Sequence, residues 1–237
     1  MVELFANSLW DGFWLSSMTG KAIVLAQIAG SVLLLALAIG KFTTLHRAGQ
    51  TTRRVSHDVM TGQNVLEYYL QRRPYPRSAV ERIYVGACER LLTLLSPDAR
   101  SAVAVRDGTA ALSAHEVELV RALCEHTLDE GEIEVEHGMG FIGAIVALEP
   151  MLGLLGTVWG VLDAFADMGT AGSATIATMA PAISSALVTT VVGLLVAIPG
   201  VAAHTRLSAS IRNITADLEG FTDDLVGRIA LEYQGNK

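Results

Sequence analysis

Three long apolar runs constrain this chain more than any other feature. A helix needs about 20 apolar residues to cross the hydrocarbon core of a bilayer. The runs at 21–41, 139–165 and 176–203 are each long enough to cross, the last two with some tilt. Charged residues make up only 17% of the chain, against about 25% in a soluble domain. The sequence therefore predicts an all-α membrane protein with three transmembrane helices.

The distribution of basic residues predicts how these helices are oriented. Cytoplasmic flanks of membrane helices carry an excess of Lys and Arg. Of the 17 such residues, twelve lie between Lys41 and Arg121 and four follow the third run, whereas the connection 166–175 has none. We therefore expect 42–138 and 204–237 to be cytoplasmic and 166–175 to be a short outward loop.

The first residues are expected to lie outside the cytoplasm. Residues 1–20, "MVELFANSLWDGFWLSSMTG", contain no Lys or Arg, so they lack the positive region of a signal peptide. Their aromatic and apolar side chains can share one side of a helix at the membrane surface. We interpret this stretch as a retained interfacial segment, with the N-terminus outside and the C-terminus cytoplasmic.

The cytoplasmic parts are predicted to be helical, with a large insertion at 42–138 and a C-terminal helix at 204–237. Apolar residues in the tail recur in steps of three and four, which is typical of helices that pack against helices. They are Leu207, Ile211, Ile214, Leu218, Phe221, Leu225 and Ile229. This stripe packs either against the protein's own cytoplasmic helices or against another subunit, and the sequence leaves both open.

Small and polar residues gather on one side of the second and third runs. On a helical wheel at about 100° per residue, one side of the second run is small and polar. It holds Glu149, Gly153, Gly156, Gly160 and Asp163, with Thr157 at the margin. The corresponding side of the third run holds Ala186, Thr189 and Gly193, with Ser185 and Thr190 at the margins. Small faces allow helices to approach closely in lipid, which by itself would explain the glycines.

Glu149 is not explained by helix packing. A charged carboxylate at the centre of a membrane helix costs roughly 2.5–3.5 kcal/mol. The adjacent Pro150 removes the N–H that would bond residue 146 and loosens the helix beside the acid. We expect a single copy of the chain to expose Glu149 and both small faces to lipid. An inward-facing lumen formed by several copies therefore fits better.

In the first run, Gln27 is the only strongly polar side chain.

The strings "PMLGLLGTVWGVLDAF" (150–165) and "MAPAISSALVTTVVGLLVAIPGVAAHTRL" (179–207) carry a family resemblance. They resemble the MotA/TolQ/ExbB proton-channel family, on its TolQ/ExbB branch. The more specific part is Gly-Leu-x-Gly-Thr-Val-Trp-Gly, because this string would rarely occur by chance in an apolar helix. The rest of the chain is similar only in its architecture of one span, a large insertion, two spans and a helical tail.

The resemblance implies a homopentamer in the bacterial inner membrane whose second and third spans line a pore. The pore would hold a single-span ExbD-like or TolR-like partner with a membrane aspartate. Proton flow past that aspartate would move the partner. This movement would be passed to TonB-like or TolA-like proteins. On matching positions, Thr157 and Thr190 fall on the family's pore-lining threonines. Their hydroxyls can donate to and accept from a carboxylate.

One pair of positions departs from the family pattern. The family's Ala-Pro-Gly-Ile-Ala-Glu-Ala-Leu stands here as Ala-Pro-Ala-Ile-Ser-Ser-Ala-Leu, so Ser185 replaces an intramembrane glutamate. Conversely, the position before the matched proline is usually serine and is here Glu149. The change is either a relocated acid or the mark of a branch with another ion or output. The candidate ion pathway is Glu149, Thr157, Ser185, Thr189 and Thr190.

No sequence motif indicates an enzyme, a metal site, a cofactor or nucleic-acid binding. The chain has no P-loop, nucleophile elbow or paired-histidine motif. Cys88 and Cys124 are expected to be free thiols in a reducing compartment. Two other functions stay open, a secondary transporter and a structural membrane scaffold. The lack of an internal repeat argues against the first, and Glu149 with the two threonines argues against the second.

Overall fold

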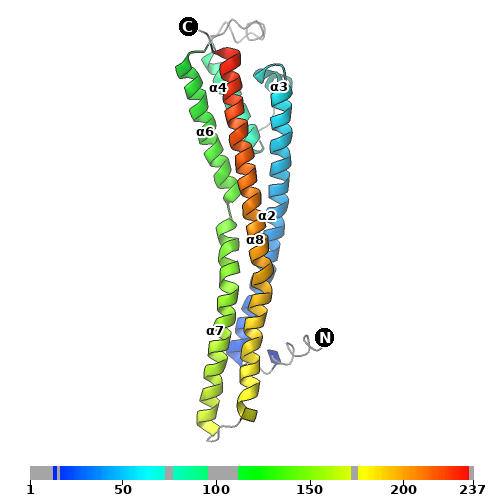
Figure 1. Cartoon of the computed structure of the whole chain (residues 1–237), viewed down its shortest axis with the longest axis vertical. Coiled ribbons are helices and arrows are strands. Elements are labelled where there is room, and N and C mark those ends of the chain that lie inside the picture. The colour runs from blue at the N-terminus through cyan, green and yellow to red at the C-terminus, as the bar shows by residue number, and fades with distance from the viewer. Residues whose placement is uncertain (1–12, 15–16, 73–76, 96–111, 172–175, 235–237) are drawn as a thin grey trace. The chain divides into compact units, whose positions relative to one another are not determined.

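The computed structural model describes residues 13–14, 17–72, 77–95, 112–171 and 176–234 (Figure 1). Within these ranges the chain is helical apart from short links and a single bridge between Leu112 and Gln234, and it contains no β-strand. The helices are α2 (Met18–Thr61), α3 (Val65–Arg72), α4 (Ala79–Leu94), α6 (Ala114–Glu136), α7 (Met139–Ala171) and α8 (Ile176–Tyr233). The prediction of an all-α protein is confirmed for the described part of the chain.

Three helical stretches are long and apolar enough to cross a membrane. They are Met18–Thr61, Ala114–Gly169 and Met179–Tyr233. The first two contain the runs 21–41 and 139–165, and the third contains all but the first three residues of 176–203, so the predicted number of spans is confirmed by length and composition. Most large apolar side chains of these runs are exposed in the single chain, as expected of surfaces that meet lipid or other helices.

The helices extend further than the apolar runs that predict them. α2 continues past residue 41, because Leu45, Val55 and Val59 on its later turns are buried. The third run and the tail form the single helix α8. α7 reaches Ala171, so it includes part of the predicted loop 166–175. The rest of that loop and most of the predicted interfacial segment 1–20 lie outside the described residues.

The chain divides into two compact units. The first comprises Met1–Lys41 and Gly138–Ser208, and the second comprises Phe42–His137 and Ala209–Lys237. The first unit contains all three apolar runs. The second contains α3, α4, α6 and the later turns of α2 and α8.

The apolar stripe of the tail is buried within one chain. Leu218, Phe221, Leu225 and Ile229 are each at most 2% exposed, and the other members of the stripe are also buried. Of the two interpretations that the sequence left open, packing against the protein's own helices therefore accounts for this stripe.

Arg228 of α8 binds the end of α2 through hydrogen bonds within the second unit. Its guanidinium donates to the carbonyl oxygens of Val59 at 3.0 Å, Met60 at 2.9 Å and Gly62 at 2.5 Å. Carbonyls in the last turn of a helix have no partner further along it, so this side chain supplies the missing donors. Glu232 pairs with Arg228 at 2.7 Å and accepts from the Val65 N–H at 2.9 Å, at the start of α3.

The two cysteines lie in the core of the second unit. Cys88 of α4 and Cys124 of α6 are both buried and free, as the sequence predicts. Burial raises the pKa of each thiol to about 12. Because the thiolate is the reactive form of cysteine, both side chains are chemically inert in the folded chain.

Replacing Arg228 is expected to destabilise the second unit. Arg228→Met removes a charged donor from three carbonyl groups, so we expect the free energy of unfolding to fall by about 2 kcal/mol or more. Chemical denaturation of the purified chain in detergent, followed by circular dichroism, measures this loss. The control is Arg212→Met on an exposed position of the same helix. Equal stability of the two variants would show that the Arg228 contacts contribute nothing.

Candidate functional site

The small faces of α7 and α8 pack against each other within one chain. A Cβ atom added at Gly153 would stand 2.9 Å from the Thr190 Cα, and one at Gly160 would stand 2.5 Å from the Ala186 Cβ. A Cβ atom added at Gly156 would come closer still and overlap the Thr189 hydroxyl oxygen. The expectation that a single copy exposes both small faces to lipid is therefore wrong. The small residues allow the backbones of α7 and α8 to approach closely, as lipid-embedded helices with such faces do.

This close approach brings together the two threonines that the family resemblance singled out. The Thr190 hydroxyl donates to the Gly153 carbonyl oxygen at 2.9 Å and lies 3.5 Å from the Thr157 hydroxyl oxygen. Thr157 in turn donates to the Leu154 carbonyl oxygen at 2.7 Å. Both side chains are only partly buried in the single chain. Each hydroxyl oxygen keeps lone pairs that can accept further hydrogen bonds.

Thr189 lies in the interior of the first unit, although its hydroxyl shares the Gly153 carbonyl oxygen with Thr190. It is 1% exposed, and its hydroxyl lies 2.7 Å from the Ala186 carbonyl oxygen and 3.1 Å from that of Gly153. The Gln27 amide nitrogen of α2 donates to the Thr189 carbonyl oxygen at 3.1 Å and to that of Glu149 at 3.4 Å. One residue therefore joins all three membrane-crossing helices.

Glu149 is buried at this junction and does not face lipid. Its exposed fraction is 2%, and its carboxyl group lies against Gly30 of α2, where an added Cβ would overlap the Oε1 atom. A Cβ at Gly193 of α8 would stand 2.6 Å from the Glu149 carbonyl oxygen. The predicted exposure of Glu149 in a single copy is thus also wrong, because α2 covers the side of α7 on which the acid lies.

Ser185 does not join the other candidate residues through a hydrogen bond in the described structure. It is 6% exposed, and its hydroxyl donates to the Ala182 carbonyl oxygen of the same helix at 2.9 Å. Gln27, in contrast, is a functional candidate that the sequence reasoning did not assign. The only signal for it was its polarity within an otherwise apolar run.

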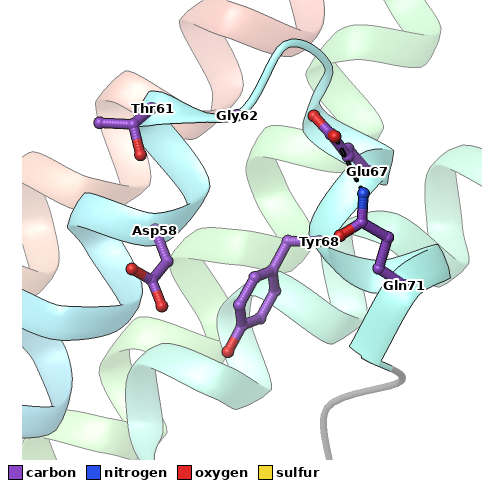
Figure 2. Close-up of a pocket in the computed structure, with 6 residues that line it drawn as sticks. All are labelled: Asp58, Thr61, Gly62, Glu67, Tyr68 and Gln71. Carbon is purple, nitrogen blue, oxygen red and sulfur yellow. Dashed lines mark hydrogen bonds between the residues drawn. The ribbon is translucent and has the colours of Figure 1, made fainter.

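A shallow polar pocket lies in the second unit, at the turn between α2 and α3 (Figure 2). It is lined by Asp58, Thr61, Gly62, Glu67, Tyr68 and Gln71. The Glu67 carboxylate accepts from the Gln63 N–H at 2.8 Å and from the Gln71 amide at 2.9 Å, so it caps the local chain. No cluster of three metal-ligating side chains occurs among the described residues. The pocket therefore gives no indication of a metal centre.

The chain is similar to known proteins over most of its length. Residues 97–220 match the MotA/TolQ/ExbB proton channel family. The chain is 30% identical to the Tol-Pal system protein TolQ of Haemophilus influenzae over 219 residues, which cover 90% of each chain. It is 27% identical to the TolQ protein of Pseudomonas aeruginosa over 220 residues, covering 92% of this chain and 90% of the relative.

A second group of relatives matches over a shorter stretch. The chain is 40% identical to the biopolymer transport protein ExbB of Neisseria gonorrhoeae over 94 residues, which cover 40% of this chain and 43% of the relative. The family is described as one of proton channels and not as a class of enzyme. The apolar helices and these matches show a multi-pass membrane protein. The chain belongs to the MotA/TolQ/ExbB proton channel family, on its TolQ/ExbB branch.

Proposed function

We propose that this chain is the pore-forming ring subunit of an inner-membrane motor driven by the proton motive force. The observation that carries the proposal is the Thr157–Thr190 pair, whose hydroxyl oxygens lie 3.5 Å apart on a partly exposed side of α7 and α8. Hydroxyls can both donate to and accept from a carboxyl group, so such a pair can hydrate a carboxylate or bind its protonated form.

The carboxyl group in question belongs to a partner. The proposed partner is an ExbD-like or TolR-like protein with one membrane helix that carries an aspartate. Five copies of this chain surround the partner helices, with α7 and α8 lining the pore. Protons that enter from outside load the aspartate and leave past the threonines toward the cytoplasm. The resulting movement of the partner acts on TonB-like or TolA-like proteins.

The orientation follows the basic residues. Residues 1–20 and 166–175 face outward, 21–41, 139–165 and 176–203 cross the membrane, and the remaining segments, 42–138 and 204–237, are cytoplasmic. The Lys and Arg residues of the chain lie almost entirely in these cytoplasmic segments, which favours this orientation.

Glu149 is proposed to relay the proton that leaves the partner aspartate. The motivation is the absence of the family glutamate at Ser185 and the presence of an acid at a position that is usually serine. The acid lies four residues before Gly153, whose carbonyl oxygen accepts from Thr190. One turn of α7 therefore separates the buried acid from Gly153, which accepts from Thr190, and about two turns separate it from Thr157.

The first test concerns assembly. The chain co-expressed with its ExbD-like or TolR-like partner is expected to purify as a pentamer that contains partner helices. Native mass spectrometry of the detergent complex measures the stoichiometry. A stable monomer or dimer in the presence of the partner would contradict the ring.

The second test concerns the hydroxyl pair. Thr157→Val and Thr190→Val keep the side-chain volume but remove the hydroxyl, so each is expected to abolish ion-coupled function and leave assembly intact. Thr157→Ser and Thr190→Ser, which keep the hydroxyl, are the matched controls and are expected to retain function. Growth that depends on the motor measures the outcome. Full function in both valine variants would show that these threonines only pack the helices.

The third test concerns the acid. Glu149→Gln and Glu149→Ser are expected to lose ion-coupled function, because neither side chain can carry and release a proton. Glu149→Ser combined with Ser185→Glu restores the usual family arrangement and is expected to recover function at least in part. Full activity of Glu149→Gln with normal assembly would rule out the relay.

A further inference from the structure

The junction of α2, α7 and α8 holds two buried hydrogen-bond acceptors that lack a donor. Gln27 is fully buried and Glu149 is 2% exposed. Among the described residues, the Oε1 atom of Gln27 and the Oε2 atom of Glu149 are the buried side-chain atoms without a hydrogen-bond partner. A buried acceptor without a donor costs about 1–3 kcal/mol, more if it is charged. Two such atoms at one junction therefore indicate that the site binds a hydrogen-bond donor.

The orientation of the Gln27 amide is fixed by its neighbours. Its nitrogen lies near the carbonyl oxygens of Thr189 and Glu149, at 3.1 and 3.4 Å. Turning the amide over would place its oxygen against these two acceptors, which is unfavourable. Both N–H groups are thus directed to backbone carbonyls, and the Gln27 oxygen is left as an acceptor that can only be satisfied by a donor from elsewhere.

Two glycines make room for the polar groups. A Cβ at Gly30 would overlap the Glu149 Oε1 atom, and a Cβ at Gly193 would stand 2.7 Å from the Gln27 amide nitrogen. Gly30 lies one turn after Gln27 on the same side of α2. The site is therefore built by residues from three helices, and any larger residue at these positions would displace the acid or the amide.

Three neutral residues of α2 and α8 lie against Glu149. They are Gln27, Gly30 and Gly193. No ion pair of the described residues involves Glu149. An ionised carboxylate here would be buried without a counter-ion, which proteins avoid. One added proton removes the charge and turns the carboxyl group into a donor.

We propose that Gln27 and Glu149 form an internal proton-holding site in each subunit. Glu149 carries the proton on its carboxyl group, and Gln27 is the positioning residue whose Oε1 atom accepts it, directly or through one water molecule. Loading adds one proton to the Glu149 carboxylate and gives the neutral acid; release breaks the same O–H bond and returns the carboxylate. This inference deepens the proposed relay and rests on the proposed function for its role in transport.

Infrared spectroscopy of the full chain in lipid vesicles at neutral pH tests the site without measuring transport. The difference spectrum between the native chain and Glu149→Gln is expected to contain one carbonyl band of a protonated carboxylic acid. Asp163→Asn is the matched control, because it removes another α7 carboxyl group, and it is expected to leave that band unchanged. A difference spectrum with only carboxylate bands at Glu149 would overturn the proposal.

Two further variants test the roles of α2 residues. Gln27→Leu removes the acceptor, so the acid band is expected to persist and move to higher frequency. Gly30→Ala displaces the carboxyl group and is expected to shift or remove the band even if Gln27→Leu fails to fold. An unchanged band in either folded variant would overturn the assignment of that residue.

The outcome separates this inference from the proposed function. An acid band that responds to Gln27→Leu, together with full function in the threonine variants, would retain the internal site and reject the hydroxyl-lined pore. Loss of transport in Glu149→Gln without any acid band would retain the motor and reject the proton-holding site.

Discussion

The close contact between α7 and α8 is the constraint on which the membrane-crossing unit depends. Between helices in lipid, burial of apolar surface supplies little driving force, so close packing and hydrogen bonds have to hold them together. Gly153, Gly156 and Gly160 permit a distance at which two threonine hydroxyls of α8 reach the Gly153 carbonyl oxygen of α7. A larger residue at Gly153 would meet the backbone of Thr190 directly, and the position of every polar group nearby would change.

This contact gives two adjacent threonines different surroundings. Consecutive residues of a helix point about 100° apart, so Thr189 and Thr190 differ in exposure, although both hydroxyls reach the Gly153 carbonyl oxygen. Thr190 lies beside Thr157 on a partly exposed side, whereas Thr189 lies in the interior, where its carbonyl accepts from Gln27 of α2. A partly exposed hydroxyl pair and a buried polar cluster therefore lie next to each other at a single helix contact.

The sequence predicted the features that a single helix determines. The apolar runs gave the number of spans, and the wheel placed Gly153, Gly156 and Gly160 on one small face, which the structure shows in contact with α8. The family strings indicated Thr157 and Thr190, which the structure brings together. Their role in a pore stays a prediction.

The features that depend on a third helix could not be predicted in the same way. A wheel of the second run shows which side Glu149 occupies, but not that Gly30 and Gln27 of α2 cover that side. The exposure expected for Glu149 was wrong for this reason. The spacing of apolar residues likewise could not decide what covers the apolar stripe of the tail. Helices of the same chain and helices of another subunit would present the same kind of apolar surface to it.

The burial of Cys88 and Cys124 has a practical consequence for work on this protein. Both thiols are enclosed in the second unit and remain protonated at neutral pH, since burial raises the pKa of each to about 12. Thiol-specific probes react with the thiolate, so they pass over these two side chains in the folded chain. A cysteine introduced at an exposed position can then carry a spin label, a fluorophore or a cross-linker while both native cysteines stay in place.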